Sequence, residues 1–529
     1  MTRCFINGTV RTMDPGQPVA EAVVVEGTRI GFVGKNDDAR VRAGARAGVV
    51  DLQGATMLPG FIDDHTHLVG GGRHLQGIDL RPCRSKEEFS RTLREYAAAH
   101  SGAWITDGDW DHEAWSPARL PRRDWIDDIA AETPVFVQRF DGHMALANSV
   151  ALRLAGITGS TPDPEGGTID RDPATGEPTG ILRDLAMNIV AEVVPRPAPQ
   201  EIERAALTAL DHARRRGLTS VHDISLPEHY ETYEKLDREN RLTCRLYCRL
   251  PLEGHRALTE RGVQHGHGSK FLVHGSMKAF SDGSLGSDTA WFFEPYVSNP
   301  STCGLPMEVL TSGKLREWAL EADRNLLQLS IHAIGDRANA AVLDIFEEIV
   351  RVNPPWDRRF RIEHAQHVRP EDVPRFARLG VIVSAQPYHA VDDGVWAAKR
   401  IGEHRCAQAY VFRDFLQAGV RVCFGSDWTV APLDPLLGIS AAVTRRTLDG
   451  KNPGGWYPAQ MLTVEEAVRC YTLNNAYAEF CEHEKGSIEK GKLADLVVLG
   501  GDPWEVQPEK IGELEVLRTV VGGEDVWRV

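Results

Sequence analysis

Two histidines spaced two residues apart follow an apolar stretch early in the chain. His65 and His67 end the run 58–67, LPGFIDDHTH, which reads as a buried strand. Alternate residues of a strand point the same way, so both imidazoles are expected to project together from its end. Two imidazole nitrogens aimed at one point form half of a transition-metal site.

A second pair with the same spacing shows that the pattern alone is weak evidence. His265 and His267 lie in the glycine-rich stretch 261–269, where no strand would fix the directions of the rings. We interpret this pair as part of a solvated loop. The first pair is favoured because it directly follows an apolar strand.

Further polar residues end other apolar runs of the chain. These runs lie near 276, 330, 362 and 423 and end in Lys278, His332, His364 and Asp427. Taken singly, His332 reads as a hydrogen-bonded core histidine and Asp427 as the cap of a turn. In a barrel of parallel strands, however, all the carboxyl ends meet at one face. The set therefore predicts a cage of metal ligands.

Lys278 is the unusual member of this set, because an ammonium group repels a metal ion. Two interpretations remain open. The lysine could pair with a carboxylate such as Asp282. Alternatively, its amine could react with carbon dioxide to give a carbamate, an anionic ligand able to bridge two metals.

From about residue 200 the pattern alternates between helix and strand, as in a parallel sheet. Together with the strand that ends at His65, strands near 220, 247, 276, 330, 362, 383 and 423 give eight βα units. The chain is therefore predicted to form an α/β fold, a (β/α)8 TIM-type barrel over 58–479. An open doubly wound sheet is the alternative, but no glycine-rich phosphate loop follows the first strand.

Both ends of the chain read as short strands and turns. We expect 1–57 and 480–529 to form one small composite β-sandwich domain. The stretch 70–200 is too long for an ordinary crossover and predicts a subdomain inserted after strand one. Within it, Trp110 and His143 are candidate substrate contacts, or equally ordinary core residues. Asp282 and His389 are further weak candidates for substrate binding.

The net charge and the cysteine content of the chain indicate which kinds of partner and which compartment to expect. The 529 residues carry a net charge of -15, which argues against nucleic acid or an anionic membrane as a partner. The 9 cysteines include no CxxC pair, and no signal peptide or membrane-spanning run is evident, so we expect a cytoplasmic protein. The expected partner is a small-molecule substrate, and a homo-oligomer remains possible.

Together these motifs resemble the amidohydrolase superfamily, which carries HxH on strand one, lysine on strand four, histidines on strands five and six and aspartate on strand eight. More narrowly, several stretches are similar to the branch that contains N-substituted formamide deformylase. They are DGHM at 141–144 with Asn148 and Ser149, DGSLGS at 282–287, HAIGD at 332–336, and GSDW at 425–428. The similarity spans nearly the full chain.

This resemblance implies roles for the candidate residues. The metal ligands would be His65, His67, His332, His364 and Asp427, with Lys278 as a carboxylated bridge. Asp427 would also act as general base and acid. One or two divalent metal ions are expected, with Zn²⁺ favoured, although the ligand types also suit iron, manganese or cobalt.

The expected activity is metal-dependent hydrolysis of a non-peptide carbon–nitrogen bond in an amide, formamide or cyclic amide. Deaminases of the superfamily typically carry an HxxE motif after strand five, whereas here Gly335 stands three residues beyond His332. Deamination is therefore disfavoured. Hydrolysis of lactones or other esters is the alternative on the same site. A catalytically retired barrel that serves as a binding protein is the alternative from another class.

Overall fold

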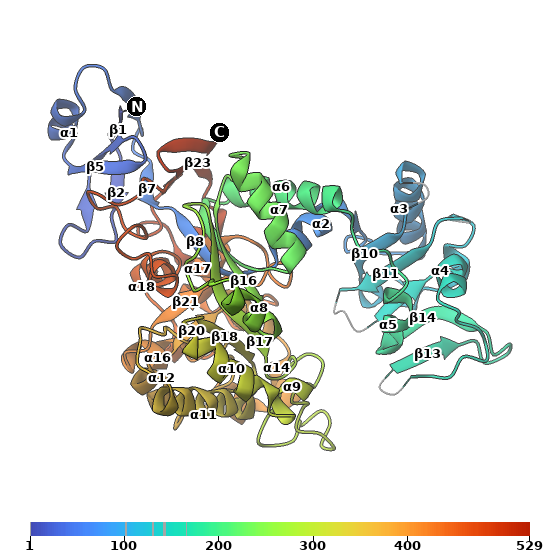
Figure 1. The fold of residues 1–529 in the computed structure, drawn as a ribbon. Helices are drawn as coiled ribbons and strands as arrows, with labels where there is room; N and C mark the ends of the chain where they lie inside the picture. The colour runs from blue at the N-terminus through green and yellow to red at the C-terminus, as the bar shows by residue number, and fades with distance from the viewer. Residues whose placement is uncertain (1, 101–102, 130–131, 141–143, 165–166) are drawn as a thin grey trace. The chain divides into compact units, whose positions relative to one another are not determined.

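The computed structural model describes residues 2–100, 103–129, 132–140, 144–164 and 167–529 (Figure 1). The chain divides into two compact units, one formed by 1–69 and 209–529 and the other by 70–208. Among the described residues, none of the helices combines the length and the apolar character that a membrane crossing requires.

Eight parallel strands form the centre of the first unit. Beyond their carboxyl ends, the backbone N–H of Asp427 donates to the carbonyl of His65 (2.7 Å) and that of His67 to the carbonyl of Trp428 (3.0 Å). These bonds join the two outermost strands, so the sheet closes into a ring and the predicted (β/α)8 barrel is confirmed. In order around the barrel the strands are β8 (Phe61–Thr66), β15 (Leu218–Ile224), β16 (Arg245–Pro251), β17 (Leu272–Phe280), β18 (Leu329–Ala333), β19 (Arg361–His364), β20 (Ile382–Ala385) and β21 (Val422–Phe424).

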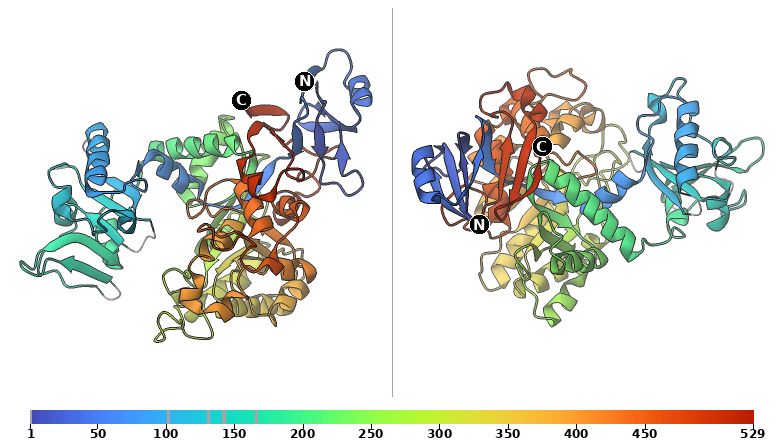
Figure 2. Two further views of the ribbon diagram at one scale, coloured as in Figure 1. Left: turned by 180° about the vertical axis from the view of Figure 1, so that it is seen from behind. Right: turned by 90° about the horizontal axis from the view of Figure 1, so that it is seen from above.

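Helices cover the outside of these strands, as the views from behind and from above show (Figure 2). The helix α11 (Asp336–Val352) follows β18, and its buried face includes Val342, Phe346 and Ile349. Other helices of this layer are α6 (Pro199–Arg215), α7 (Pro227–Arg238), α8 (His255–Glu260), α10 (Lys314–Arg324), α12 (Val373–Leu379), α13 (Pro387–Asp393), α16 (Phe412–Gln417), α17 (Pro435–Thr444), α18 (Val464–Cys470) and α19 (Leu473–Ala478).

Strands from both ends of the chain build a separate β sandwich. One sheet has the order β5-β4-β1-β6 and the other β24-β23-β22-β7-β2-β3. Because β7 pairs antiparallel with β22, the two ends share a sheet, and Phe5 and Val23 of one sheet pack with Met57 and Leu496 of the other. The strands are β1 (Thr2–Ile6), β2 (Thr9–Arg11), β3 (Val19–Ala20), β4 (Ala22–Glu26), β5 (Arg29–Gly34), β6 (Gly48–Asp51), β7 (Thr56–Pro59), β22 (Leu496–Leu499), β23 (Val516–Val521) and β24 (Glu524–Arg528).

The second unit, 70–208, contains a six-stranded mixed sheet of its own. Its order is β13-β14-β12-β11-β10-β9. The helix α3 (Lys86–Ala99) begins at Ser85, whose side chain accepts the N–H of Glu88, as the capping pattern predicts. The strands are β9 (Ile78–Asp79), β10 (Ile105–Trp110), β11 (Val135–Arg139), β12 (Met144–Ala147), β13 (Gly167–Arg171) and β14 (Pro178–Asp184).

Candidate metal centre

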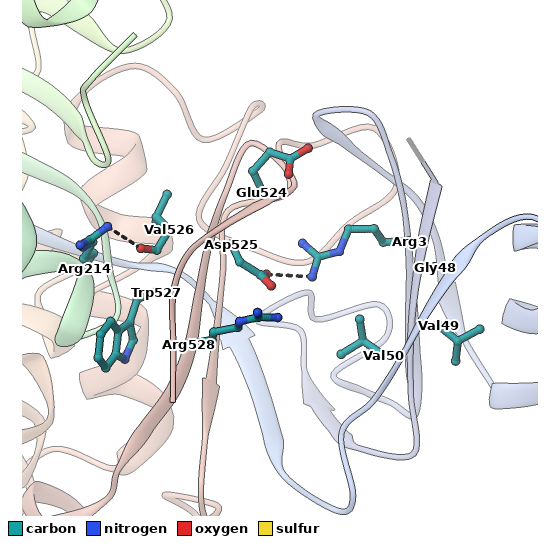
Figure 3. Close-up of a pocket in the computed structure, with 10 residues that line it drawn as sticks. All are labelled: Arg3, Gly48, Val49, Val50, Arg214, Glu524, Asp525, Val526, Trp527 and Arg528. Carbon is teal, nitrogen blue, oxygen red and sulfur yellow. Dashed lines mark hydrogen bonds and ion pairs between the residues drawn. The ribbon is translucent and has the colours of Figure 1, made fainter.

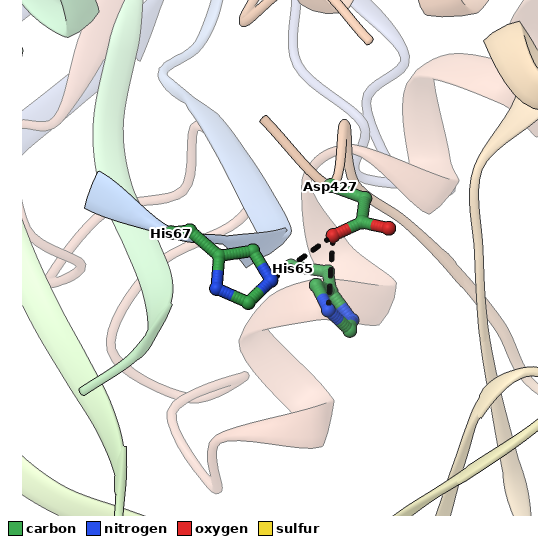
Figure 4. Close-up of side chains that lie close together, drawn as sticks. All are labelled: His65, His67 and Asp427. Carbon is green, nitrogen blue, oxygen red and sulfur yellow. Dashed lines mark ion pairs between the residues drawn. The ribbon is translucent and has the colours of Figure 1, made fainter. Parts of the chain in front are cut away.

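The two histidines at the end of β8 point at one carboxylate. Oδ1 of Asp427 lies 3.4 Å from Nε2 of His65 and 3.2 Å from Nε2 of His67 (Figure 4). The His65 ring is fully buried, whereas the side chain of His67 is 42% exposed. The three groups therefore form a corner that is closed on the barrel side and open on the other.

A bulge and a close backbone contact produce this corner. The pairing of β8 with β15 shifts register between Asp63 and Thr66, which adds one residue to β8 and re-aims its last side chains. The imidazoles of His65 and His67 nevertheless converge on Asp427. Oδ1 of Asp63 accepts the N–H groups of His65 and Ser426, both at 3.0 Å, and so ties β8 to the segment that carries Asp427.

A second group of candidate ligands shares the same aspartate. His364, at the end of β19, and His389, on α13, each bring a ring nitrogen within 4.8 Å of a carboxylate oxygen of Asp427 and of one another. The two rings stack at 6.4 Å between centroids. His364 and Asp427 both adopt left-handed backbone conformations, with φ of 71° and 56°. Such strain in non-glycine residues concentrates at functional sites.

Burial favours the neutral form of three of these rings, which is the form that binds metal. It lowers the pKa of His65, lowers that of His364 well below its usual value, and lowers that of His332 to about 3. Burial alone would raise the pKa of Asp427, but the neighbouring His65 ring and the hydrogen bond from His67 hold it well below its ordinary value.

Two outer contacts hold the rings of the candidate ligands His65 and His364, and neither contact was predicted from the sequence. Nδ1 of His65 lies 2.6 Å from Oε2 of Glu363, and Nδ1 of His364 lies 2.8 Å from Oε1 of Gln386. Burial opposes the charge of Glu363, yet Arg249 and Arg361 hold its pKa well below the usual range. The available signal was a charged residue inside an apolar strand, which is costly unless it has a partner.

The remaining predicted ligands, His332 and Lys278, lie beside these two groups. The ring of His332 is 4.5 Å from that of His364, and its Nε2 lies 3.0 Å from the carbonyl of Gly283. Nζ of Lys278 is buried 4.1 Å over the ring of Phe280, and it finds no hydrogen-bond partner in the part of the chain that the structure describes. Burial lowers the pKa of Lys278 to about 8.

Two weak candidates for substrate binding have structural positions instead. Asp282 is completely buried, and it accepts the backbone N–H groups of Trp291, Ile334 and Gly335 rather than pairing with Lys278. Trp110 is likewise fully buried in the core of the second unit, and its Nε1 donates to the carbonyl of Val137. His143 lies outside the described residues.

The donor set fits a divalent metal. Neutral imidazoles and an ionised carboxylate at a strand-end corner are the ligand types of zinc and related ions. Outer hydrogen bonds to Nδ1 of His65 and His364 are the usual supports of such ligands. The residues that would hold the metal are His65, His67, His364 and Asp427, with His389, His332 and Lys278 within the same end of the barrel.

A separate hollow lies along the edge of the β sandwich. It measures about 530 Å³ and is bordered by β6 and β24 (Figure 3). Two of its charged groups already have partners, since Arg3 pairs with Asp525 at 2.8 Å and Arg214 donates to the carbonyl of Val526 at 2.9 Å. Imidazoles and a carboxylate converge at the barrel end, which is therefore the candidate site.

A closed barrel of eight parallel strands, with imidazoles and a carboxylate at the strand ends, is the fold of a class of metal-dependent hydrolases. The Amidohydrolase family profile matches residues 48–526. The chain therefore belongs to the amidohydrolase family, and the resemblance drawn from its motifs is confirmed.

Individual relatives agree with this membership. The chain is 37% identical to Protein LONG AFTER FAR-RED 3 of Arabidopsis thaliana, over 98% of this chain and 91% of that protein. It is 30% identical to N-substituted formamide deformylase of Arthrobacter pascens, over 98% of this chain and 97% of that enzyme. A solved structure of an uncharacterized metal-dependent hydrolase from Pyrococcus furiosus superposes with a TM-score of 0.79 at 30% identity, covering 96% of this chain and 100% of that chain.

Proposed function

We propose that this chain hydrolyses the carbon–nitrogen bond of a small formamide, amide or cyclic amide at a divalent-metal centre. The observation that carries the proposal is the single carboxylate, Asp427, shared by two groups of imidazoles at the carboxyl end of the barrel. The name of the Arthrobacter pascens relative supports a formamide as the first substrate class to test.

The chemistry follows from the groups at this corner. A bound divalent ion, with Zn²⁺ favoured by these donors, supplies Lewis acidity that acidifies water and polarises a carbonyl. Asp427 accepts the proton of the attacking water and returns it to the leaving nitrogen, a role worth about 10²–10⁴-fold in rate. Nε2 of His389 is buried and has no hydrogen-bond partner among the described residues, so it is available to a polar atom of the substrate.

Lys278 has a role in the same proposal. Its amine is buried without a hydrogen-bond partner in the described chain. The ammonium first loses one proton, and addition of carbon dioxide to the neutral amine forms an N–C bond and releases a second, so that an anionic carbamate replaces a buried cation. Together with His332, this anion would let the centre hold a second ion.

The test is a substrate panel on zinc-loaded protein. N-benzylformamide, N-benzylacetamide, a five-membered cyclic amide and the matching lactone are compared by release of acid and of amine. We expect turnover of at least one carbon–nitrogen substrate and its loss in D427N. Preference for the lactone would instead identify an ester hydrolase, and a protein that neither binds zinc nor turns over any substrate would be the retired barrel.

A further inference from the structure

Four charged side chains fill the barrel interior directly beneath the metal centre. Arg249 of β16, Arg361 and Glu363 of β19, and Asp64 of β8 are each 0% exposed. Charged residues are almost never buried this completely unless they are paired, because removing a charge from water is costly. Two positive and two negative groups balance one another, so the cluster, here called the buried charge layer, is neutral.

Contacts within the layer converge on Glu363. Nη1 of Arg249 donates to its Oε2 at 2.6 Å, and Nε of Arg361 lies 3.4 Å from its Oε1. Asp64 forms an ion pair with Arg361 and lies 3.7 Å from Nη2 of Arg249. Both guanidinium groups therefore face Glu363 as well as Asp64, and their charge favours an ionised Glu363 that can only accept hydrogen bonds.

Glu363 is also the member that contacts a predicted metal ligand. Its Oε2 lies 2.6 Å from Nδ1 of His65 and accepts the hydroxyl of Ser384, also at 2.6 Å. An ionised carboxylate has no proton to give, so the proton on this contact belongs to Nδ1 of His65. With its proton on Nδ1, a neutral His65 ring directs the lone pair of Nε2 toward Oδ1 of Asp427, 3.4 Å away.

We propose that Glu363 is a positioning residue that fixes the tautomer and direction of the His65 ring for metal binding, and that Arg249 and Arg361 serve this role by keeping its charge in place. The inference rests on the metal centre of the proposed function. It goes beyond that function because it gives the buried charge layer a role in metal binding in addition to its role in folding.

A purely structural role for the layer is the competing explanation. Removing one member of a buried ion pair destabilises a fold whatever else that member does. The chain offers a matched control in Asp323 of α10, which is also completely buried and pairs with Nε of Arg358 at 2.8 Å, and which contacts no predicted ligand. E363Q and D323N should both lower the melting temperature.

Zinc affinity separates the two explanations. It is measured on the full-length protein by competition with a chromophoric chelator, without any substrate. We expect E363Q to bind Zn²⁺ about 10–100-fold more weakly than wild type, the range found for outer partners of ligands. D323N should bind it as wild type does. Equal affinities in E363Q and wild type would overturn the proposal.

A double variant tests the division of roles inside the layer. Removing the facing charge as well, in E363Q/R249M, should recover much of the melting temperature because no unpaired charge remains. Zinc affinity should stay low, since the carboxylate is still missing. Affinity that recovers together with stability would assign the layer to folding and contradict the proposal.

If E363Q fails to fold, S384A carries the test, because it removes one hydrogen bond to Glu363 without changing any charge. Weaker zinc binding at an unchanged melting temperature supports the proposal, and unchanged binding overturns it. Zinc-loaded wild type that hydrolyses no amide would contradict only the proposed function. Unaltered zinc affinity in these variants would contradict only the role of Glu363.

Discussion

Two His-x-His pairs in this chain have the same spacing and different surroundings. His65 and His67 leave a barrel strand, and both reach Asp427. His265 lies in a loop, where its ring stacks on Trp356 at 5.1 Å and its Nδ1 lies 2.9 Å from the carbonyl of Leu326. His267 is exposed on the same loop.

The difference lies in what fixes the rings. In the first pair the backbone is tied on both sides, by β15 and by the segment around Asp427, and a buried carboxylate holds Nδ1 of His65. In the second pair one ring is directed by packing and the other faces solvent. The spacing alone only brings two imidazoles close together in the sequence. A strand end within a closed barrel also directs both of them at the same carboxylate.

The largest effect is expected from a variant that alters Asp427, the carboxylate that both rings of the first pair reach. D427N should lower turnover by about 10²–10⁴-fold, because the amide cannot accept the proton of the attacking water. The circular dichroism spectrum should stay that of the wild type. Steady-state kinetics of zinc-loaded protein provide the measurement, and near-normal rates would exclude Asp427 from proton transfer.

The next largest effect is expected from variants that compare the two His-x-His pairs directly. H67N should lower zinc affinity by more than about 100-fold, the upper range for outer partners, because a predicted ligand is lost outright. His67 is partly exposed, so the fold should tolerate the change. H267N is the matched control and should retain both zinc and activity. Equal zinc content in the two variants would remove the distinction drawn between the pairs.

A smaller effect tests the close backbone contact at the first pair. A Cβ at Gly425 would lie 2.4 Å from the backbone nitrogen of His65 and 2.7 Å from Oδ1 of Asp63. G425A should therefore lower the free energy of unfolding by about 1–3 kcal/mol, as overpacking does. Urea denaturation measures the loss, and G254A, where a Cβ meets nothing within 4 Å, is the control.

The smallest effects are expected at the second pair. H265A should lose about 1 kcal/mol of stability, a typical cost for a point mutation, through the lost packing on Trp356. H267A should change the free energy of unfolding by less than about 0.5 kcal/mol, as for most surface positions. Neither should alter zinc affinity. A drop in zinc binding in either variant would place the second pair in a metal site.

The barrel was predictable from sequence because apolar runs and helix periodicity mark its eight strands and α11. The exact ends of the strands were harder to predict. The strand expected near 220 runs from Leu218 to Ile224, because its pairing with β16 continues to Arg249. Partner strands, rather than local composition, set such limits.

The candidate site was predictable where its residues stand at strand ends, and not where they lie inside strands. His65, His364 and Asp427 could be inferred to meet because carboxyl ends meet in a barrel. Glu363 and Arg249 could not, because the partner of a buried charge depends on which strands become neighbours. Trp110 is an example of the opposite kind, a predicted contact that lies in a core. No feature of the sequence distinguishes an aromatic residue that lines a pocket from one that packs inside the insert.

The pairing of β7 with β22 has a consequence for biosynthesis. The strands that lead into β8 leave the ribosome early, yet the partners that complete their sheet follow the whole barrel. Until those last strands emerge, β7 presents an unpaired edge to the cell, the kind of surface that chaperones recognise and that aggregates form on. Ribosome-arrested chains ending before 496 should therefore be more readily cleaved by protease within 1–57 than chains released at full length.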